Sequence, residues 1–359
     1  MKQTNLSRIF ATLLILSIVL VGCAPAAAPA AEEPPAEEPA AEEPAVETPT
    51  DLKIAVLTGS SIEQPYVATL INAFDRFNEE NEYGLTISYD YTENIWGDEA
   101  EVAIRAYAET GEYDIIWAHS AYSDQVANVM DEYPELMFVF AGSGNTGLGE
   151  NAYFVFAHLQ DCAYLAGVAA GMMTETNVLG AVAGYPYEDV TDVLNGFIDG
   201  AKSVNEDIKV KIAYIESWYD PPKAEETTYA LIAAGADLVY AERFGCFEAL
   251  ADKGLYGFGN YGDQYDMAPD VVLTSATLGF DPHVDYIIGE WWGHAVEDKP
   301  WNASVEPVWY GLADGGCDIA PFRDDKAPQE VQDAVMATRD EIISGAIKVE
   351  LKVEPPESD

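Results

Sequence analysis

The feature that most constrains the fold is an alternation of short apolar segments with longer amphipathic ones along residues 51–359. The segment 52–59 (LKIAVLTG) is typical of a buried strand ending at a glycine turn. Residues 65–81 (PYVATLINAFDRFNEEN) carry apolar side chains at helical spacing, with Pro65 in the first turn. The pattern repeats and predicts about nine strands, which alternate with helices. Such alternation produces parallel sheets with helices on both faces, and this length indicates two of them. Further helices are expected at 98–111, 123–134, 163–173, 190–204 and 224–235.

Ligands of open parallel sheets bind outside the carboxyl ends of the strands. Functional side chains are therefore expected just after the segments IAVLTG, IIWAHS, KIAYIES, LVYAERF and YGFGNYG. Ser60 and Ser61 follow the first strand and are candidate hydroxyl donors. Tyr122 and Asp124 are expected to line the mouth of a site, although Asp124 equally suits the first turn of a helix. Phe244 is a candidate to close over a ligand.

A glycine-rich stretch, GSGNTG at 142–147, matches the spacing of the dinucleotide-binding fingerprint. That fingerprint requires a helix to open inside the motif, whereas the following residues, LGENAYFVFAHL, read as a loop and then a strand. We therefore interpret these glycines as a flexible surface loop and predict no nucleotide cofactor.

The N-terminus has the organisation of a secretion signal. Lys2 and Arg8 are followed by a mostly apolar run, 9–21, which is shorter than the ~20 residues of a membrane-spanning helix. The run ends in Leu20-Val21-Gly22-Cys23, which resembles the lipobox of bacterial lipoproteins, in which the cysteine becomes the acylated N-terminus. Residues 1–23 are therefore expected to be a lipoprotein signal with Cys23 as the lipidation site. The alternatives are an ordinary cleaved signal and a buried helix followed by an unrelated cysteine.

Residues 24–51 are expected to be a disordered tether. From residue 24 to residue 50 there are seven Glu, seven Pro and no Lys or Arg. Proline favours extended conformations and like charges repel, so the segment is expected to be stretched. Several acyl chains on one residue meet the need for more than one hydrophobic signal in stable anchoring. We expect a globular body held at a membrane, on its extracytoplasmic face.

The formal net charge of the chain is −46, and the tether accounts for only a small part of it. A strongly acidic body repels nucleic acid, so no nucleic-acid partner is expected. Arg243 is one of few cations, and a surface ion pair is its favoured interpretation.

Beyond Cys23 the chain has Cys162, Cys246 and Cys317, without the spacing of a zinc site. Three buried thiols are the favoured expectation, with a Cys246–Cys317 bridge as the lesser alternative. The four histidines are scattered and no HExxH occurs, so no metal site is predicted.

The segment DCAYLAG at 161–167 resembles the start of a helix in the basic membrane protein family of ABC-transporter substrate-binding lipoproteins, which includes purine nucleoside receptors of spirochaetes. Asp and Cys stand here where Glu and Gly are common in that family. Further matching segments occur in the family's order: NGFIDGAKSVN, AAGADLVY, YGDQYDMAPDVVLTS and IISGAIKV. The resemblance covers essentially residues 52–353.

The resemblance implies a type I periplasmic binding protein, an α/β fold in which two doubly wound parallel-sheet lobes are joined by a three-segment hinge. We expect lobe 1 at 52–157 plus about 278–305, and lobe 2 at 158–277 plus about 306–359. Closure of such lobes around a ligand is a known switching mode.

Family members stack a purine between two aromatic rings, which by position are Tyr66 and Trp218 here. The alternative for each is a packing role. The family's asparagine after the first aromatic is Val67 here, and a common lysine is Leu278. Asn260 stands near the position of a ribose-binding aspartate and is the candidate sugar contact. With these polar groups changed, the pocket is expected to favour a nucleobase or another flat heterocycle over a full nucleoside.

The resemblance implies a binding protein that delivers a purine nucleoside, nucleobase or similar heterocycle to an ABC permease and its ATPase. One alternative is a ligand sensor of the same fold that signals to a membrane receptor or regulator. A hydrolase is a third, but no GxSxG or SxxK motif occurs and no paired carboxylates stand out. The chain is therefore not expected to be an enzyme.

Overall fold

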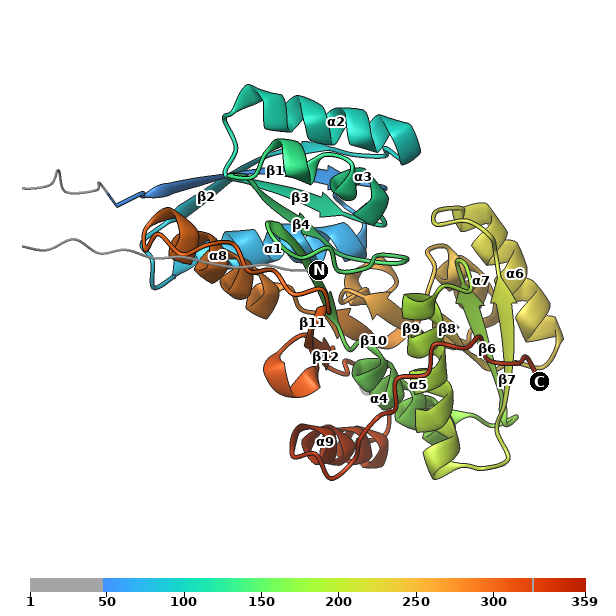
Figure 1. Cartoon of the computed structure of the whole chain (residues 1–359). Coiled ribbons are helices and arrows are strands. Elements are labelled where there is room, and N and C mark those ends of the chain that lie inside the picture. The colour runs from blue at the N-terminus through green and yellow to red at the C-terminus, as the bar shows by residue number, and fades with distance from the viewer. Residues whose placement is uncertain (1–47, 325) are drawn as a thin grey trace, which may run out of the picture. The chain divides into compact units, whose positions relative to one another are not determined.

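The computed structural model of the protein describes residues 48–324 and 326–359, which belong to one compact unit. Two six-stranded sheets form its framework (Figure 1). The first sheet has the order β11-β5-β4-β3-β1-β2, and all its neighbouring strands are parallel. Its strands are β1 (Asp51–Thr58), β2 (Thr86–Thr92), β3 (Ile115–His119), β4 (Met137–Phe140), β5 (Ala152–Ala157) and β11 (Val308–Tyr310).

The second sheet has the order β12-β10-β9-β8-β6-β7. It is parallel except for β12, which runs antiparallel to β10. Its strands are β6 (Val178–Ala183), β7 (Lys209–Tyr214), β8 (Leu238–Ala241), β9 (Tyr256–Tyr261), β10 (Val272–Leu278) and β12 (Cys317–Ile319). The expectation of two parallel sheets is confirmed, and the described chain has more strands than the roughly nine predicted.

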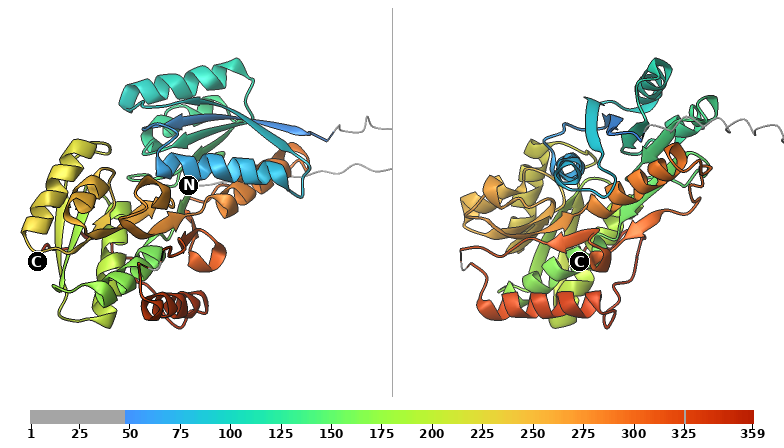
Figure 2. Two further views of the ribbon diagram at one scale, coloured as in Figure 1. Left: turned by 180° about the vertical axis from the view of Figure 1, so that it is seen from behind. Right: turned by 90° about the vertical axis from the view of Figure 1, so that its left-hand side faces the viewer.

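Helices cover both faces of each sheet, as Figures 1 and 2 show. In the first lobe these are α1 (Pro65–Glu79), α2 (Gly97–Thr110), α3 (Ser123–Ala127) and α8 (Asp281–Ala295). In the second lobe they are α4 (Gln160–Met173), α5 (Glu188–Val204), α6 (Pro221–Ala233), α7 (Cys246–Lys253) and α9 (Gln329–Ile343). Three short 3₁₀ turns complete the described elements: η1 (Met130–Glu132), η2 (Tyr265–Met267) and η3 (Leu312–Asp314). The helix expected at 123–134 is thus shorter than predicted, and η1 follows it.

The local sequence explains these elements. All five residues of β3 are buried, as expected for a central strand covered by helices on both faces. In α1, Val67, Leu70, Phe74 and Phe77 are buried at helical spacing, so one face of the helix packs on the sheet. Pro65 suits the start of α1, where no intrahelical N–H bond is lost.

The tightest helix pair is α4 against α5, where glycines replace side chains at the contact. A Cβ on Gly200 would overlap the carbonyl oxygen of Tyr164, and one on Gly167 would overlap that of Phe197. Both glycines therefore allow the backbones to approach closely, a requirement that no other residue meets.

The chain crosses between the two sheets three times. It passes from β5 to α4, from β10 to α8, and from β11 to η3. The crossings are bonded to one another: His158 N–H donates to the Tyr310 carbonyl at 3.0 Å, and Gly279 N–H donates to the Gly316 carbonyl at 2.8 Å. This is the three-segment hinge of a type I periplasmic binding protein, and the fold expectation is confirmed. Strand β11 joins the first sheet slightly beyond the lobe boundary expected at about residue 305.

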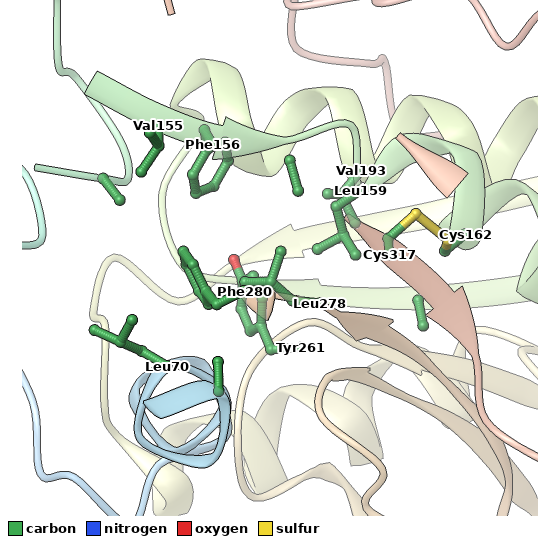
Figure 3. Close-up of a cluster of buried hydrophobic side chains, with 14 of the residues drawn as sticks. Leu70, Val155, Phe156, Leu159, Cys162, Val193, Tyr261, Leu278, Phe280 and Cys317 are labelled. Carbon is green, nitrogen blue, oxygen red and sulfur yellow. A yellow bond between two sulfur atoms is a disulfide. The ribbon is translucent and has the colours of Figure 1, made fainter. Parts of the chain in front are cut away.

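A disulfide joins Cys162 at the start of α4 to Cys317 in β12, beside the hinge (Figure 3). The expectation of three thiols is therefore wrong, and so is the alternative Cys246–Cys317 pair. Helix α4 packs on β12, which brings together cysteines 155 residues apart in sequence. Cys246 is free and buried in α7.

Among the described residues, no helix is both long enough and apolar enough to cross a bilayer. The predicted signal segment, the lipidation site at Cys23 and most of the predicted tether lie outside the described residues.

Candidate functional site: a cavity between the lobes

A cavity lies between the two lobes, at the carboxyl ends of strands from both sheets. The first lobe lines it with residues at or after the ends of β1, β3 and β4, and the second lobe with residues from the ends of β7, β8 and β9. Thr58 lies opposite His119 in the β1–β3 register, so these two strands deliver their ends to one edge. The empty space, including the open mouth, is about 780 Å³, a size common among small-molecule sites.

Aromatic rings from both lobes form much of the cavity wall. Tyr66, in the first turn of α1, stacks on His119 with ring centroids 4.4 Å apart and packs edge-on to Tyr261 at 5.5 Å. Trp218, in the loop after β7, packs against Tyr185 at 5.0 Å. The Arg243 guanidinium lies 5.2 Å from the Trp218 ring centroid. These faces suit a flat ligand, because aromatic pairs favour stacked or edge-to-face packing.

One wall of the cavity is an ion pair between neighbours in sequence, Glu242 and Arg243. The Glu242 carboxylate accepts from Arg243 Nε at 2.8 Å, from Tyr261 Oη at 3.0 Å and from Gly184 N–H at 2.9 Å. Arg243 Nη1 donates to the Trp218 carbonyl at 3.1 Å. Because the Glu242 side chain is fully buried, this pair is not the surface ion pair that the sequence favoured. Most of its hydrogen-bonding groups are occupied within the protein, and its bonds to the Tyr261 hydroxyl and the Trp218 carbonyl fix the positions of these two residues.

A hydrogen bond crosses the cavity from one lobe to the other. The Ser143 hydroxyl, after β4, lies 2.5 and 2.6 Å from the two carboxylate oxygens of Asp189, in the first turn of α5. Burial raises the pKa of Asp189 to about 6; the nearby charge of Glu242 adds to this, while the Ser143 bond and the charge of Arg243 oppose it. Gly142, beside Ser143, also lines the cavity. The 142–147 segment is therefore partly a cavity wall and not simply the surface loop that its composition indicated.

His119 and Tyr66 each present a buried polar atom without a hydrogen-bond partner among the described residues. His119 is 1% exposed, and its Nε2 lies 3.4 Å from the Tyr66 carbonyl oxygen while its Nδ1 is unpaired. Burial lowers the pKa of His119 to about 3, so the ring is neutral. The Tyr66 hydroxyl is also unpaired, and burial raises its pKa well above the usual value.

The structure brings four of the eight predicted contact residues into the cavity: Ser60, Tyr66, Trp218 and Phe244. The other four lie elsewhere. The Ser61 hydroxyl bonds Glu63, and Asp124 is exposed in the first turn of α3. The remaining two, Tyr122 and Asn260, are core residues. The Tyr122 hydroxyl donates to the Ile95 carbonyl at 2.7 Å, and the Asn260 side-chain oxygen accepts from Tyr240 at 2.8 Å.

Sequence reasoning missed several cavity residues. Two of them, His119 and Glu242, stand inside the segments IIWAHS and LVYAERF, whose ends were expected to carry the site. Trp96 and Asp189 follow no such rule, since they enter the cavity from a loop and from a helix start that only the folded chain brings near. Among the described residues, no cluster of three or more His, Cys, Asp or Glu side chains is placed to hold a metal.

Comparison with known proteins gives relatives that align with about three quarters of this chain. The chain is 29% identical to a purine-binding protein of Brucella abortus, over 74% of this chain and 73% of that protein. It is 30% identical to a Haloferax volcanii protein named as an ABC transporter glucose-binding protein, over 72% of this chain and 64% of that one. Among solved structures, a transcriptional activator from Bacillus halodurans superposes with a TM-score of 0.66 at 21% identity, over 83% of this chain and 100% of that one. This last similarity shows the fold alone.

The model of one protein family, described as ABC transporter substrate-binding proteins of the PnrA-like type, matches residues 52–353. That match spans both lobes and all three crossings of the hinge. The chain therefore belongs to the PnrA-like family of ABC transporter substrate-binding proteins.

Proposed function

We propose that the protein captures a purine base, or a closely similar flat heterocycle, between its lobes and delivers it to an ABC permease and its ATPase. The observation that carries this proposal is the cavity itself, which Tyr66 from one lobe and Trp218 from the other both line. Stacking on such rings is worth ~1–3 kcal/mol per base and suits any base, because every base has a π-face. The purine-binding relative from Brucella supports the assignment.

A base is favoured over a nucleoside because the candidate sugar contact, Asn260, and two positions where polar groups of the family are replaced, Val67 and Leu278, lie in the core. Val67 and Leu278 are buried in the core at 0% and 4% exposure. The Asn260 oxygen is occupied by the Tyr240 hydroxyl, and the residue is 1% exposed. A ribose placed here would leave hydroxyls without these partners, at a cost of ~1–3 kcal/mol for each unpaired buried group.

The proposed setting is extracytoplasmic. Cys23 would carry the acyl anchor, and the tether at 24–51 would let the two lobes reach the permease while remaining at the membrane. The lobes would close on the ligand and present a closed surface to the permease.

The test is identification of what co-purifies with the protein produced without residues 1–23, by mass spectrometry, followed by calorimetric titration. We expect adenine, hypoxanthine or guanine to bind, with the corresponding nucleoside no tighter. D-glucose is the necessary comparison, because one relative is named for it. Saturable binding of D-glucose with no response to any purine would refute the ligand assignment.

A further inference from the structure

Two sets of polar groups in the cavity differ in how far their hydrogen bonds are already made within the protein. Glu242, Arg243 and Tyr261 bond to one another, and the charge of Glu242 is paired with that of Arg243. The groups of the second set can make further hydrogen bonds: the Asp189 carboxylate, His119 Nδ1 and the Tyr66 hydroxyl. Buried polar atoms in native proteins nearly always have partners, so groups left over at a cavity wall indicate where a ligand bonds.

The protonation of His119 follows from its neighbour. Its Nε2 faces the carbonyl oxygen of Tyr66, which can only accept a hydrogen bond. Nε2 therefore carries the hydrogen, and in the neutral ring Nδ1 carries a lone pair that has no partner among the described residues, on a side chain that lines the cavity. His119 is thus an acceptor for a ligand and not a donor.

The Asp189 carboxylate is an acceptor as well. Among the described residues its one side-chain partner is the Ser143 hydroxyl, which has one proton for two carboxylate oxygens. An ionised carboxylate offers about four lone-pair positions, so most of them remain available. The charge of Arg243 acts on Asp189, but the Arg243 guanidinium is hydrogen-bonded to Glu242.

We propose that Asp189 and His119 are the specificity-determining residues of the cavity, and that each accepts a hydrogen bond from an N–H group of a flat heterocycle. A free purine base meets this requirement, because it has two N–H donors in different places. One is on the six-membered ring or its exocyclic amine, and the other is on the five-membered ring. A nucleoside has lost the N–H at the glycosidic nitrogen. This inference deepens the proposed function and rests on it.

The test uses the protein produced without residues 1–23, since the described residues form one compact unit. Calorimetric titration compares adenine, hypoxanthine and guanine with their singly N-methylated forms, so that one N–H is removed at a time. We expect methylation at two different nitrogens to weaken binding, each by ~10–100-fold, since each leaves an acceptor of the cavity wall unpaired.

The variants Asp189→Asn and His119→Phe assign the acceptors. Asp189→Asn keeps the shape of the side chain, and His119→Phe keeps a ring against Tyr66 while removing Nδ1. Each is expected to weaken the parent base by ~10–100-fold and to abolish discrimination against one methylated form. His119→Asn, which restores an acceptor near Nδ1, should recover part of the loss. Asp124→Asn is the matched control, because Asp124 also stands in the first turn of a helix but is exposed outside the cavity.

Thermal melting of each variant checks that it is folded. If a purine binds but both variants bind it like the wild type, or if every methylated form binds like its parent, the assignment of Asp189 and His119 is wrong while the proposed function stands. If no purine binds and D-glucose does, both the proposed function and this inference are wrong.

Discussion

The disulfide makes a quantitative prediction about stability. Replacing both Cys162 and Cys317 by alanine opens a loop whose ends are 155 residues apart in sequence. In the chain-entropy model such a closed loop stabilises the folded state by ~5 kcal/mol at 25 °C, and measured values for native disulfides are commonly ~2–5 kcal/mol. For about 300 residues the unfolding entropy is ~0.6 kcal/mol per kelvin, so a loss of ~5 kcal/mol lowers the Tm by ~8 °C.

The assay is unfolding in guanidinium chloride, followed by tryptophan fluorescence, for the wild type and for the Cys162→Ala/Cys317→Ala variant. Reducing agent should lower the guanidinium chloride concentration at which the wild type is half unfolded to that of the variant, and it should leave the midpoint of the variant unchanged. Cys246→Ala is the control, because that thiol is free and buried and its replacement removes only packing. This control should still respond to reductant.

Counting the reactive thiols tests directly whether the Cys162–Cys317 bridge forms. With residues 1–23 absent, the denatured protein should expose one reactive thiol before reduction and three afterwards. Three thiols without reduction in protein secreted under oxidising conditions, or identical midpoints with and without reductant, would show that the bridge does not form.

Four further predictions follow from the cavity and the helix contact. Binding of a purine base should weaken as the pH falls through about 6, because the raised pKa of Asp189 makes its carboxyl neutral there; calorimetry between pH 5 and 8 measures this. For the same reason the ionised form opposes folding above about pH 6, so Asp189→Asn should melt at a higher temperature than the wild type at pH 8 and not at pH 4. Trp218→Ala should weaken the bound base by ~10–100-fold in the same titration, and unchanged affinity would remove Trp218 from the binding surface. Gly200→Ala should destabilise the protein by ~3 kcal/mol or more, measured by chemical denaturation, because its Cβ would overlap the Tyr164 carbonyl; a stable variant would contradict the α4–α5 packing.

The fold was accessible from sequence because hydrophobic periodicity is a local signal. Strand β3 is buried on both faces and α1 buries one face, so the apolar pattern of each can be recognised within a short stretch of sequence. The short strands β11 and β12 have three residues each, too few to show a period, and their pairing depends on distant parts of the chain. The Cys162–Cys317 bridge was missed for the same reason, since spacing alone does not reveal which cysteines meet.

The site was predictable to the level of strand ends but not of single side chains. The rule that ligands bind beyond the carboxyl ends of strands located the cavity correctly. It does not decide which of two neighbours faces inward: Tyr261 lines the cavity, whereas Asn260, one residue earlier, bonds Tyr240 in the core. Successive residues of a strand point to opposite faces, so an error of one position exchanges a ligand contact for a core residue. The hydrogen bond from Ser143 to Asp189 joins the two lobes, so the sequence around neither residue predicts it.

The bonds among the three hinge crossings have a mechanical consequence. Hydrogen bonds from His158 and Gly279 and the Cys162–Cys317 bridge connect the three crossings, so we expect the crossings to bend together, because sliding or twisting of the lobes would break these bonds. If the lobes close as proposed, we expect the path of closure to be independent of the ligand that triggers it, since the residues that line the cavity lie outside the crossings. We expect a redesigned cavity to change which molecule causes closure and to leave the amplitude of the movement between the lobes unchanged. Fluorophores fixed on the two lobes would then report different small molecules with one calibrated signal.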